Sequence, residues 1–454
     1  MNLGIASFAG TILYFGAIVA LLLSIFWRPY VGLLYLVPLL PLQTIRYHLH
    51  EFPLGANVVD IILLSVCVGL WRRGESAFPQ TPFNKLLLTY AIYTYILLWR
   101  GALFLQGDMP FWFNNVRLQD WKNYLLIPVV MFLVFSAIRE TKHMRYLIYG
   151  MCVTVLLLDR AYFHTIKDRD FSHFSYDLRD AGAMGYAGVN GFAAFQAQIA
   201  IFLLTLYCFE KKTLLKLAYL GTAAFSIYCL LFSFSRGGYA AFLVGCVFLG
   251  VTKNRMLLVL VVLLLFTWQA VVPAAVQERI MMTEGEDGSG IDSSAGTRLT
   301  IWEDALQVFK GDPIFGTGFN TYQYMHRVGP YQDTHNMYVK VLVETGLAGL
   351  AIFVLLLWKM YCCGFHLFRT ASDDFLASLG LGFAGLMVCV VAGNLFGDRW
   401  MYMQITGYTF ALLGLTLRGQ AITDQQQESA GLSEDVASPL EQDAQRMISV
   451  LGQS

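Results

Sequence analysis

Residues 375–396, Phe375-Leu-Ala-Ser-Leu-Gly-Leu-Gly-Phe-Ala-Gly-Leu-Met-Val-Cys-Val-Val-Ala-Gly-Asn-Leu-Phe396, form an apolar run without one charged side chain. A helix of about 20 such residues is long enough to cross the hydrocarbon core of a bilayer. Only 14% of the whole chain is charged, against about 25% in soluble domains. Comparable runs occur at 8–26, 30–45, 55–71, 84–106, 123–138, 145–160, 189–209, 214–234, 237–251, 256–273, 337–358 and 400–417. The sequence therefore predicts an all-α, polytopic membrane bundle of about 12–13 transmembrane helices with one large, partly helical outer loop.

Charge and cysteine content exclude several classes of partner and site. The formal net charge is zero, which argues against nucleic acid as a partner. All eight cysteines fall in predicted spans or in a link that we assign to the cytoplasmic side. We therefore expect neither disulfides nor a thiolate metal site.

The distribution of Lys and Arg predicts the sidedness of the bundle. Short basic links, which mark the cytoplasm, occur at Arg28, Arg72-Arg73, 139–145, 211–216, 253–255, 359–369 and Arg418. They alternate with longer links at 46–54, 107–122, 161–188 and 274–336. With thirteen spans, all basic links fall on one side, which places the N-terminus outside and the C-terminus inside. A count of twelve would move the N-terminus inside.

These patterns divide the chain into six parts. They are N-terminal transmembrane helices (1–160), a charged outer loop (161–188), transmembrane helices with a Ser-Arg-Gly motif (189–273), the main outer loop (274–336), C-terminal transmembrane helices (337–418) and a cytoplasmic tail (419–454). The tail is rich in Gln, Ser, Glu and Asp. Such a composition buries little apolar surface, so we predict that the tail is disordered.

The main outer loop carries a helix signal. Thr297 is a suitable N-cap for a helix over 298–310, and Gly311-Asp312-Pro313 would end it. Arg298, Trp302 and Ala305 share one face of that helix at helical spacing. Two interpretations stay open. Either the helix lies on the membrane with Trp302 at the interface, or this face lines a cavity and Arg298 binds phosphate.

Three further polar groups stand beside predicted spans. His335, with Asn336 or Thr334 as helix cap, can accept a proton from a hydroxyl near pH 7, or it has only a structural role. Arg236, in Ser235-Arg236-Gly237, is either a bidentate phosphate ligand or an interfacial anchor. Asp398 either orients His335 or pairs with Arg399, and we favour the pairing.

The order and spacing of these motifs resemble the O-antigen ligase and polymerase superfamily over roughly 189–417. The motifs are Ser235-Arg236-Gly237, Arg298-x-x-x-Trp302, Pro313-x-x-Gly316-x-Gly318, His335-Asn336-x-Tyr338 and Glu344-x-Gly346-Leu-x-Gly349, preceded by Asn190. The resemblance implies a metal-independent glycosyltransferase that needs no cofactor. It implies His335 as general base, Arg236 and Arg298 as diphosphate ligands, and Asp398, Trp302 and Asn336 as supporting residues.

The resemblance also implies the substrates and the location. The donor is a glycan on a polyprenyl diphosphate such as undecaprenyl diphosphate, and the site faces the periplasm at the bacterial inner membrane, in contact with membrane lipid. The acceptor stays open: a ligase would use lipid A core in lipopolysaccharide biosynthesis, a polymerase would extend a surface polysaccharide, and an oligosaccharyltransferase would modify a protein hydroxyl. We favour the ligase. A lipid-linked glycan flippase is the competing class, but it predicts charged residues near the middle of the membrane, whereas charge here concentrates in outer loops.

Overall fold

The chain folds into a bundle of helices, which confirms the predicted all-α polytopic class. The structure is a computed structural model, and it describes residues 5–182, 188–282, 293–328 and 333–451. The long helices are α1 (Ile5–Phe26), α2 (Tyr30–Leu39), α4 (Val58–Trp71), α5 (Asn84–Phe104), α6 (Val116–Ala137), α7 (Thr141–Ile166), α8 (Gly188–Phe209), α9 (Thr213–Leu231), α10 (Arg236–Thr252), α11 (Arg255–Val271), α15 (Met337–Thr370), α16 (Asp374–Gly393) and α17 (Met403–Leu451). The short ones are α3 (Gln43–His48), α12 (Ala274–Met281), α13 (Ser293–Gly311) and α14 (Tyr322–Met325), with 3-10 turns η1 (Leu49–Glu51), η2 (Gly55–Asn57), η3 (Tyr176–Leu178), η4 (Asn394–Phe396) and η5 (Arg399–Met401).

Each of the thirteen predicted runs coincides with one of the long helices. Within the described residues, seven helices are long and apolar enough to cross a membrane, or eight if the bent pair α11 and α12 forms one span. Four other apolar helices count 10–17 residues within the part of the chain that was searched, over 10–26, 30–39, 55–71 and 236–252. Seven or more candidate spans among the described residues agree with the predicted polytopic bundle.

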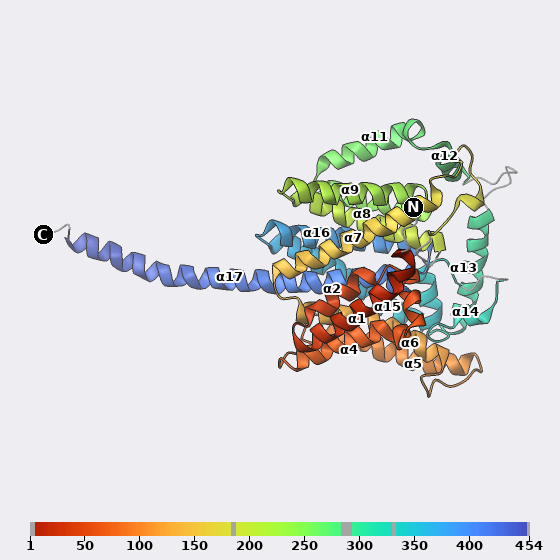
Figure 1. Ribbon diagram of the computed structural model, residues 1–454, viewed down its shortest axis with the longest axis horizontal. Helices are drawn as coiled ribbons and strands as arrows, with labels where there is room; N and C mark the ends of the chain where they lie inside the picture. The colour runs from red at the N-terminus through yellow and green to blue at the C-terminus, as the bar shows by residue number, and fades with distance from the viewer. Residues whose placement is uncertain (1–4, 183–187, 283–292, 329–332, 452–454) are drawn as a thin grey trace.

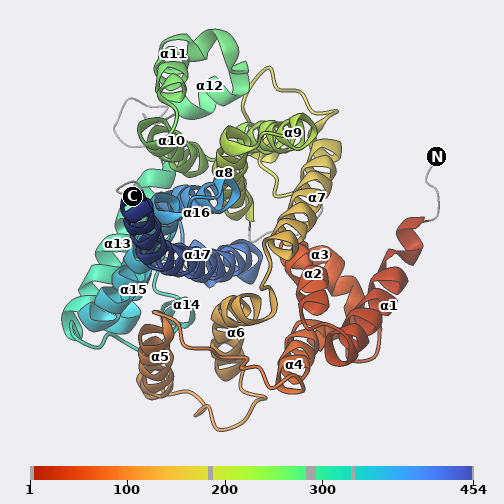
Figure 2. The same cartoon turned by 90° about the vertical axis from the view of Figure 1, so that its left-hand side faces the viewer.

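The links between the helices separate to the two ends of the bundle (Figure 1). We call the end that carries α12, α13 and α14 the loop end. The links between α8 and α9, between α10 and α11 and between α15 and α16, which are basic or short, lie at the opposite end (Figure 1). Seen along the helices, α8 and α16 lie in the middle of the bundle (Figure 2), and they are the two candidate spans with the largest buried share. The predicted alternation of links therefore corresponds to a real separation in space.

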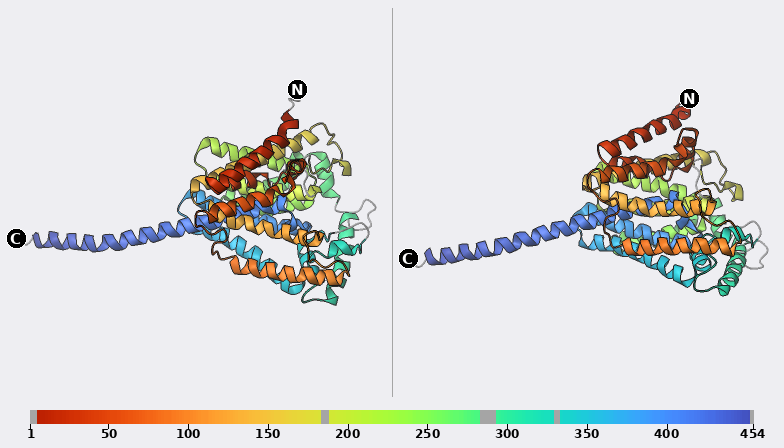
Figure 3. Two further views of the ribbon diagram at one scale, coloured as in Figure 1. Left: turned by 60° about the horizontal axis from the view of Figure 1, so that its bottom comes forward. Right: turned by 90° about the horizontal axis from the view of Figure 1, so that it is seen from below.

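Two boundaries differ from the sequence prediction. Helix α7 runs on to Ile166, into the predicted loop 161–188, because Tyr162 and Ile166 are buried in the core. Helix α17 runs from the bundle to Leu451 and projects away from the loop end (Figure 3), where we predicted a disordered tail over 419–454. A helix that is already formed in the bundle extends without a new nucleation step, so a polar continuation can remain helical.

The main loop is fastened to the bundle at a buried carboxylate. Glu344, on α15, accepts hydrogen bonds from the backbone N–H groups of Asn320 (3.1 Å) and Tyr322 (3.0 Å). The backbone of Gly318 passes so close to α5 that a Cβ there would lie 2.3 Å from Gly101 Cα. Only glycine permits this approach, and its φ of +122° also disfavours other residues. The loop is therefore a docked part of the fold.

Candidate functional site

A cavity of about 760 Å³ opens at the loop end and is strongly cationic. Five arginines line it, contributed by five separate segments of the chain, together with His335. None of the described residues that line it is Asp or Glu. We call it the arginine cavity. Its arginines are Arg179 after η3, Arg236 at the start of α10, Arg279 on α12, Arg298 on α13 and Arg399 on η5.

Close backbone contacts bring Arg236 to the cavity. Ser235 caps α10, and its side chain accepts a hydrogen bond from the N–H of Gly238 (3.4 Å). A Cβ at Gly237 would lie 2.6 Å from the Cβ of Phe396. The glycines therefore allow the Ser-Arg-Gly turn to sit against neighbouring segments, as the sequence suggested.

Asn190 ties a second arginine to the same turn. Its side-chain oxygen accepts hydrogen bonds from Arg179 (3.0 Å) and from the hydroxyl of Ser235 (2.8 Å). The polar residue that enters α8 thus links the charged segment before α8 to the motif before α10. Sequence reasoning noted Asn190 but missed Arg179.

The packing of α13 shows whether the face that carries Arg298 lies on the membrane or lines a cavity. The helix begins at Ser293, so Thr297 lies inside it and is not its cap, whereas its end at Gly311 matches the prediction. Ile301 and Ala305 are fully buried against Tyr322 and Val343. The apolar face of α13 is therefore occupied by the protein itself, and Arg298 lines the cavity.

The positively charged arginines of the cavity repel one another. Burial lowers the pKa of Arg298, and the neighbouring charges of Arg236 and Arg399 lower it further. Burial likewise lowers the pKa of Arg179, followed by the charge of Arg279. Arginine stays protonated at any physiological pH. A bound anion would reduce this repulsion. The charges of the cavity therefore favour an anionic group such as a phosphate or a diphosphate.

Arg279 is a further buried cation of the arginine cavity, and some of its hydrogen-bond donors have no partner among the described residues. Its side chain is buried, and within the described structure its Nε and Nη1 atoms have no hydrogen-bond partner. Its guanidinium lies over the rings of Phe174 (5.1 Å) and Tyr176 (5.4 Å). Buried donors without a partner are costly. At these two atoms no hydrogen-bonded acceptor from the described residues compensates the positive charge of Arg279.

His335 is held in one orientation beside the arginines. Its Nδ1 lies 2.8 Å from Oδ1 of Asp333, and its backbone N–H donates to the same oxygen (2.6 Å). Its φ of +51° is left-handed, and the next residue, Asn336, caps α15 as predicted by accepting from Tyr338 (2.9 Å). A carboxylate at Nδ1 keeps the proton there and leaves the basic lone pair on Nε2.

Trp302 supports the same turn from the main loop. Its indole Nε1 donates a hydrogen bond to the carbonyl of Thr334 (2.8 Å). This contact connects α13, which carries Arg298, directly to the residue before His335. Trp302 thus acts on the position of His335 through the backbone.

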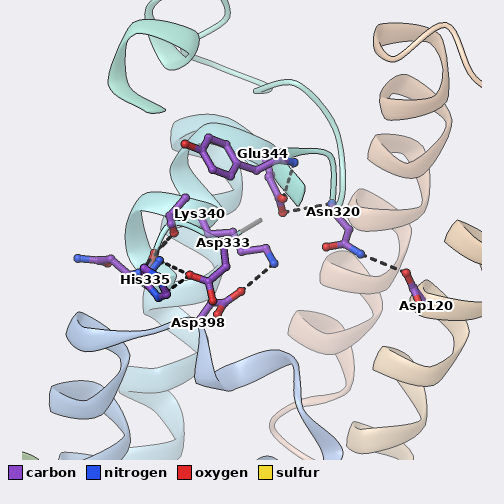
Figure 4. Close-up of polar contacts among 10 residues, drawn as sticks. Asp120, Asn320, Asp333, His335, Lys340, Glu344 and Asp398 are labelled. Atoms are coloured by element: carbon purple, nitrogen blue, oxygen red, sulfur yellow. Dashed lines mark hydrogen bonds and ion pairs between the residues drawn. The ribbon is translucent and has the colours of Figure 1, made fainter. Parts of the chain in front are cut away.

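Asp398 is a buried carboxyl that lies next to Asp333, behind His335 (Figure 4). Its Oδ2 lies 2.9 Å from Nζ of Lys340, and both side chains are almost completely buried. We expected Asp398 to pair with Arg399; this was wrong, because Lys340 from α15 occupies that position and Arg399 lines the arginine cavity. The connection of Asp398 to His335 runs through Asp333.

The two carboxyls affect each other electrostatically. Burial raises the pKa of Asp398, Lys340 opposes this rise, and the neighbouring Asp333 adds to it. For Asp333, burial alone would raise the pKa, but the hydrogen bond and charge of His335 bring it below its usual value. Asp333 is therefore the carboxylate that contacts His335, and Asp398 is the one that pairs with Lys340.

The structure thus brings Arg236, Arg298 and His335 to one cavity, with Asn336 and Trp302 fixing the histidine turn. Sequence reasoning missed Asp333, Lys340, Arg179 and Arg279. In the described part of the chain, no three His, Cys, Asp or Glu side chains gather as a metal site.

Comparison with known families identifies the region around the cavity. Residues 221–354 match the family described as O-antigen ligase. This part of the chain belongs to the O-antigen ligase superfamily. The matched residues 221–354 include Arg236, Arg279, Arg298 and His335, whereas Arg179 and Arg399 lie outside this range. No curated protein matches the chain in sequence. The match supports an O-antigen ligase-like or polymerase-like membrane glycosyltransferase that uses lipid-linked glycans and glycan acceptors.

Proposed function

We propose that this protein transfers a glycan from a polyprenyl-diphosphate carrier to an acceptor hydroxyl on the outer face of the bacterial inner membrane, as an O-antigen ligase does. One observation carries the proposal: five arginines and a carboxylate-bound histidine face one cavity at the loop end. A diphosphate needs several donors in fixed positions, and guanidinium groups provide them.

The reaction assigns a distinct role to each group. The acceptor oxygen attacks the anomeric carbon of the donor glycan and forms the new C–O bond. The bond between that carbon and the diphosphate oxygen breaks, and its electron pair stays on the diphosphate. Nε2 of His335 takes the proton of the acceptor hydroxyl as general base. Arg236 and Arg298, with the other arginines of the cavity, stabilise the charge that develops on the leaving diphosphate.

Asp333 is a positioning residue in this mechanism. Its carboxylate fixes the proton of His335 on Nδ1 and stabilises the imidazolium that forms when Nε2 takes a proton. The ion pair of Lys340 and Asp398 lies behind Asp333, on the side away from the arginine cavity. The buried cluster therefore serves the base and does not touch the diphosphate.

The cavity also supports catalysis without a metal ion. In many phosphate-transfer sites a divalent cation neutralises the leaving group. In the arginine cavity the arginines already carry positive charge. Their burial and mutual repulsion make an anion beside them favourable. We therefore propose that transfer needs no divalent cation.

The test is transfer by the purified protein in lipid nanodiscs, with a polyprenyl-diphosphate-linked glycan as donor and an extract of acceptor-bearing membranes. Product length on a gel separates a ligase, which adds a whole glycan once, from a polymerase, which produces a ladder. His335→Ala should abolish product while leaving the protein folded. Wild-type turnover by a folded His335→Ala protein would refute the general-base assignment.

A further inference from the structure

A second cavity, of about 1040 Å³, lies at the loop end beside the arginine cavity. It is formed by the link from α3 to α4, the first turns of α6, the main loop around Asn320, and the link from α16 to α17. We call it the amide cavity after its lining. It is separate from the proposed diphosphate site.

The lining of the amide cavity suits neutral, hydroxyl-rich ligands. It contains seven side-chain amides, three tyrosines and the carboxylates Asp60, Asp120 and Asp398. Amides both donate and accept hydrogen bonds, and carboxylates accept them, so together they match sugar hydroxyls, which do both. Aromatic rings offer flat apolar faces on which the C–H groups of a sugar ring can pack.

Two of the three described Lys and Arg side chains that line the amide cavity are paired with carboxylates, and the third, Arg46, contacts a methionine sulfur (3.9 Å). Lys122 lies 2.7 Å from Asp60, and Lys340 lies 2.9 Å from Asp398. The arginine cavity differs from the amide cavity, because its described lining has five arginines and no carboxylate. A diphosphate would favour the arginine cavity and meet carboxylates in the amide cavity, whereas an uncharged sugar would lose little by facing such paired charges.

The two cavities share the polar cluster behind His335. Lys340 and Asp398 line the amide cavity, and His335 lines the arginine cavity, with Asp333 bonded to His335 between them. Figure 4 shows this cluster facing Asn320 and Asp120, which are joined by a hydrogen bond of 3.3 Å across the amide cavity. The amide cavity therefore lies behind this cluster, and a glycan bound there has to extend past it to bring a hydroxyl to Nε2 of His335.

From this placement we propose that the amide cavity binds the sugar residues of the acceptor. The inference rests on the proposed function, because only a transferase has an acceptor. It adds where the acceptor is recognised, and it implies an acceptor whose binding portion is carbohydrate, as in a core oligosaccharide or a growing glycan.

The kinetic test uses two amides of the cavity that lie outside the His335 cluster. Asn123, on α6, is exposed to the cavity, and Gln323, on α14, lines it from the main loop. The matched control is Gln307→Ala, an exposed amide on α13 that lines neither cavity. Each lost hydrogen bond to a sugar should weaken binding about two- to tenfold.

We expect the double variant Asn123→Ala, Gln323→Ala to raise KM for the acceptor about tenfold, with KM for the donor and kcat within about twofold of wild type. Gln307→Ala should change neither KM. An unchanged acceptor KM in the double variant would overturn the proposal. So would a rise confined to donor KM, because the cavity would then hold the donor glycan.

A cross-linking experiment identifies the occupant without knowing the acceptor. Phe113 lines the amide cavity and its side chain is 73% exposed, so a benzophenone amino acid at position 113 can reach a bound ligand. The control position is Leu306, exposed on α13. In cells whose donor synthesis is blocked, we expect a glycan-bearing adduct at position 113 and none at position 306.

The outcomes separate the two levels of inference. An adduct that forms only when donor is made, or no adduct, would overturn the acceptor assignment. If wild-type protein transfers no glycan in nanodiscs, the proposed function fails, while the adduct at position 113 still decides whether the amide cavity binds sugar.

Discussion

Asp333→Asn is the most informative single substitution, because it removes the charge beside the proposed base without removing the base. Oδ1 of Asp333 lies 2.8 Å from Nδ1 of His335 and also accepts the backbone N–H of His335 at 2.6 Å. The amide oxygen of an asparagine can accept both bonds in the same place, but it carries no charge. The imidazolium that forms when Nε2 takes the hydroxyl proton would then lose its charged partner.

The size of the effect follows from the lost charge. Loss of a hydrogen bond to a charged group costs about 1.5–3 kcal/mol, which is about a 10- to 150-fold loss of rate if the bond strengthens in the transition state. The amide keeps the tautomer, so the lost charge is the main contribution. We therefore expect kcat to fall about 10- to 150-fold, with little change in KM for donor or acceptor.

The matched control is Asp398→Asn. An amide at position 398 keeps the size of the side chain and can still accept from Lys340, but it does not touch His335. Its kcat should stay within about tenfold of wild type. The assay is initial transfer rate in nanodiscs at saturating donor and acceptor, with folding verified by thermal unfolding. If Asp398→Asn is as inactive as Asp333→Asn, the effect is not specific to the carboxylate that contacts His335. If Asp333→Asn keeps wild-type kcat, the charge of Asp333 does not support the base.

Four further predictions concern the arginine cavity and its supports. Arg298→Lys and Arg236→Lys should each lower kcat at least about tenfold, since lysine cannot bind a diphosphate bidentately; near-normal turnover by either would remove that arginine from the diphosphate site. Gly318→Ala should lower the free energy of unfolding by about 2–4 kcal/mol, from its φ of +122° and a Cβ only 2.3 Å from Gly101 Cα, and an unchanged melting temperature would contradict this. Full transfer should persist in EDTA; loss that one divalent ion restores would refute the metal-free mechanism. Finally, because the folded-state pKa of Asp333 is lowered, its stabilising contribution is present above its unfolded pKa of about 3.9 and is lost as pH falls through the folded value. Wild type but not Asp333→Asn should therefore show this loss in unfolding scans below about pH 4.

Local signals in the sequence predicted much of the fold and part of the site. Charge-free runs located the long helices because a helix without charge must be buried in protein or lipid. Local chemistry predicted the end of α13 at Gly311 and narrowed the cap of α15 to Asn336 or Thr334, of which Asn336 is the cap. Arg236 and His335 were singled out because each is a polar side chain beside an apolar run, which is costly without a function. Arg298 was singled out because it shares a helix face with apolar residues, and all three line the arginine cavity.

The remaining site residues were missed because long-range packing determines their partners. Lys340 resembles an interfacial lysine at the start of a span, and only the fold brings it to Asp398, 58 positions away. Arg179 and Arg279 belong to charged segments in which no local pattern distinguishes one arginine from another. Asp333 did have a signal, since it stands two residues before His335 and reaches it through the left-handed turn.

The fold places Asp398 beside Lys340, and Arg399, its neighbour in the sequence, lines the arginine cavity. Arg399 is next to Asp398 in sequence, and an ion pair between them would take one guanidinium out of the arginine cavity. Lys340 neutralises Asp398 instead, at 2.9 Å, and among the described residues no carboxylate lies within 4.0 Å of the Arg399 guanidinium. The cavity that must attract a diphosphate therefore retains its arginine charge, while the carboxylates that would repel it are paired behind His335. Reversing that arrangement would lose both the anion site and the carboxylate that orients the base.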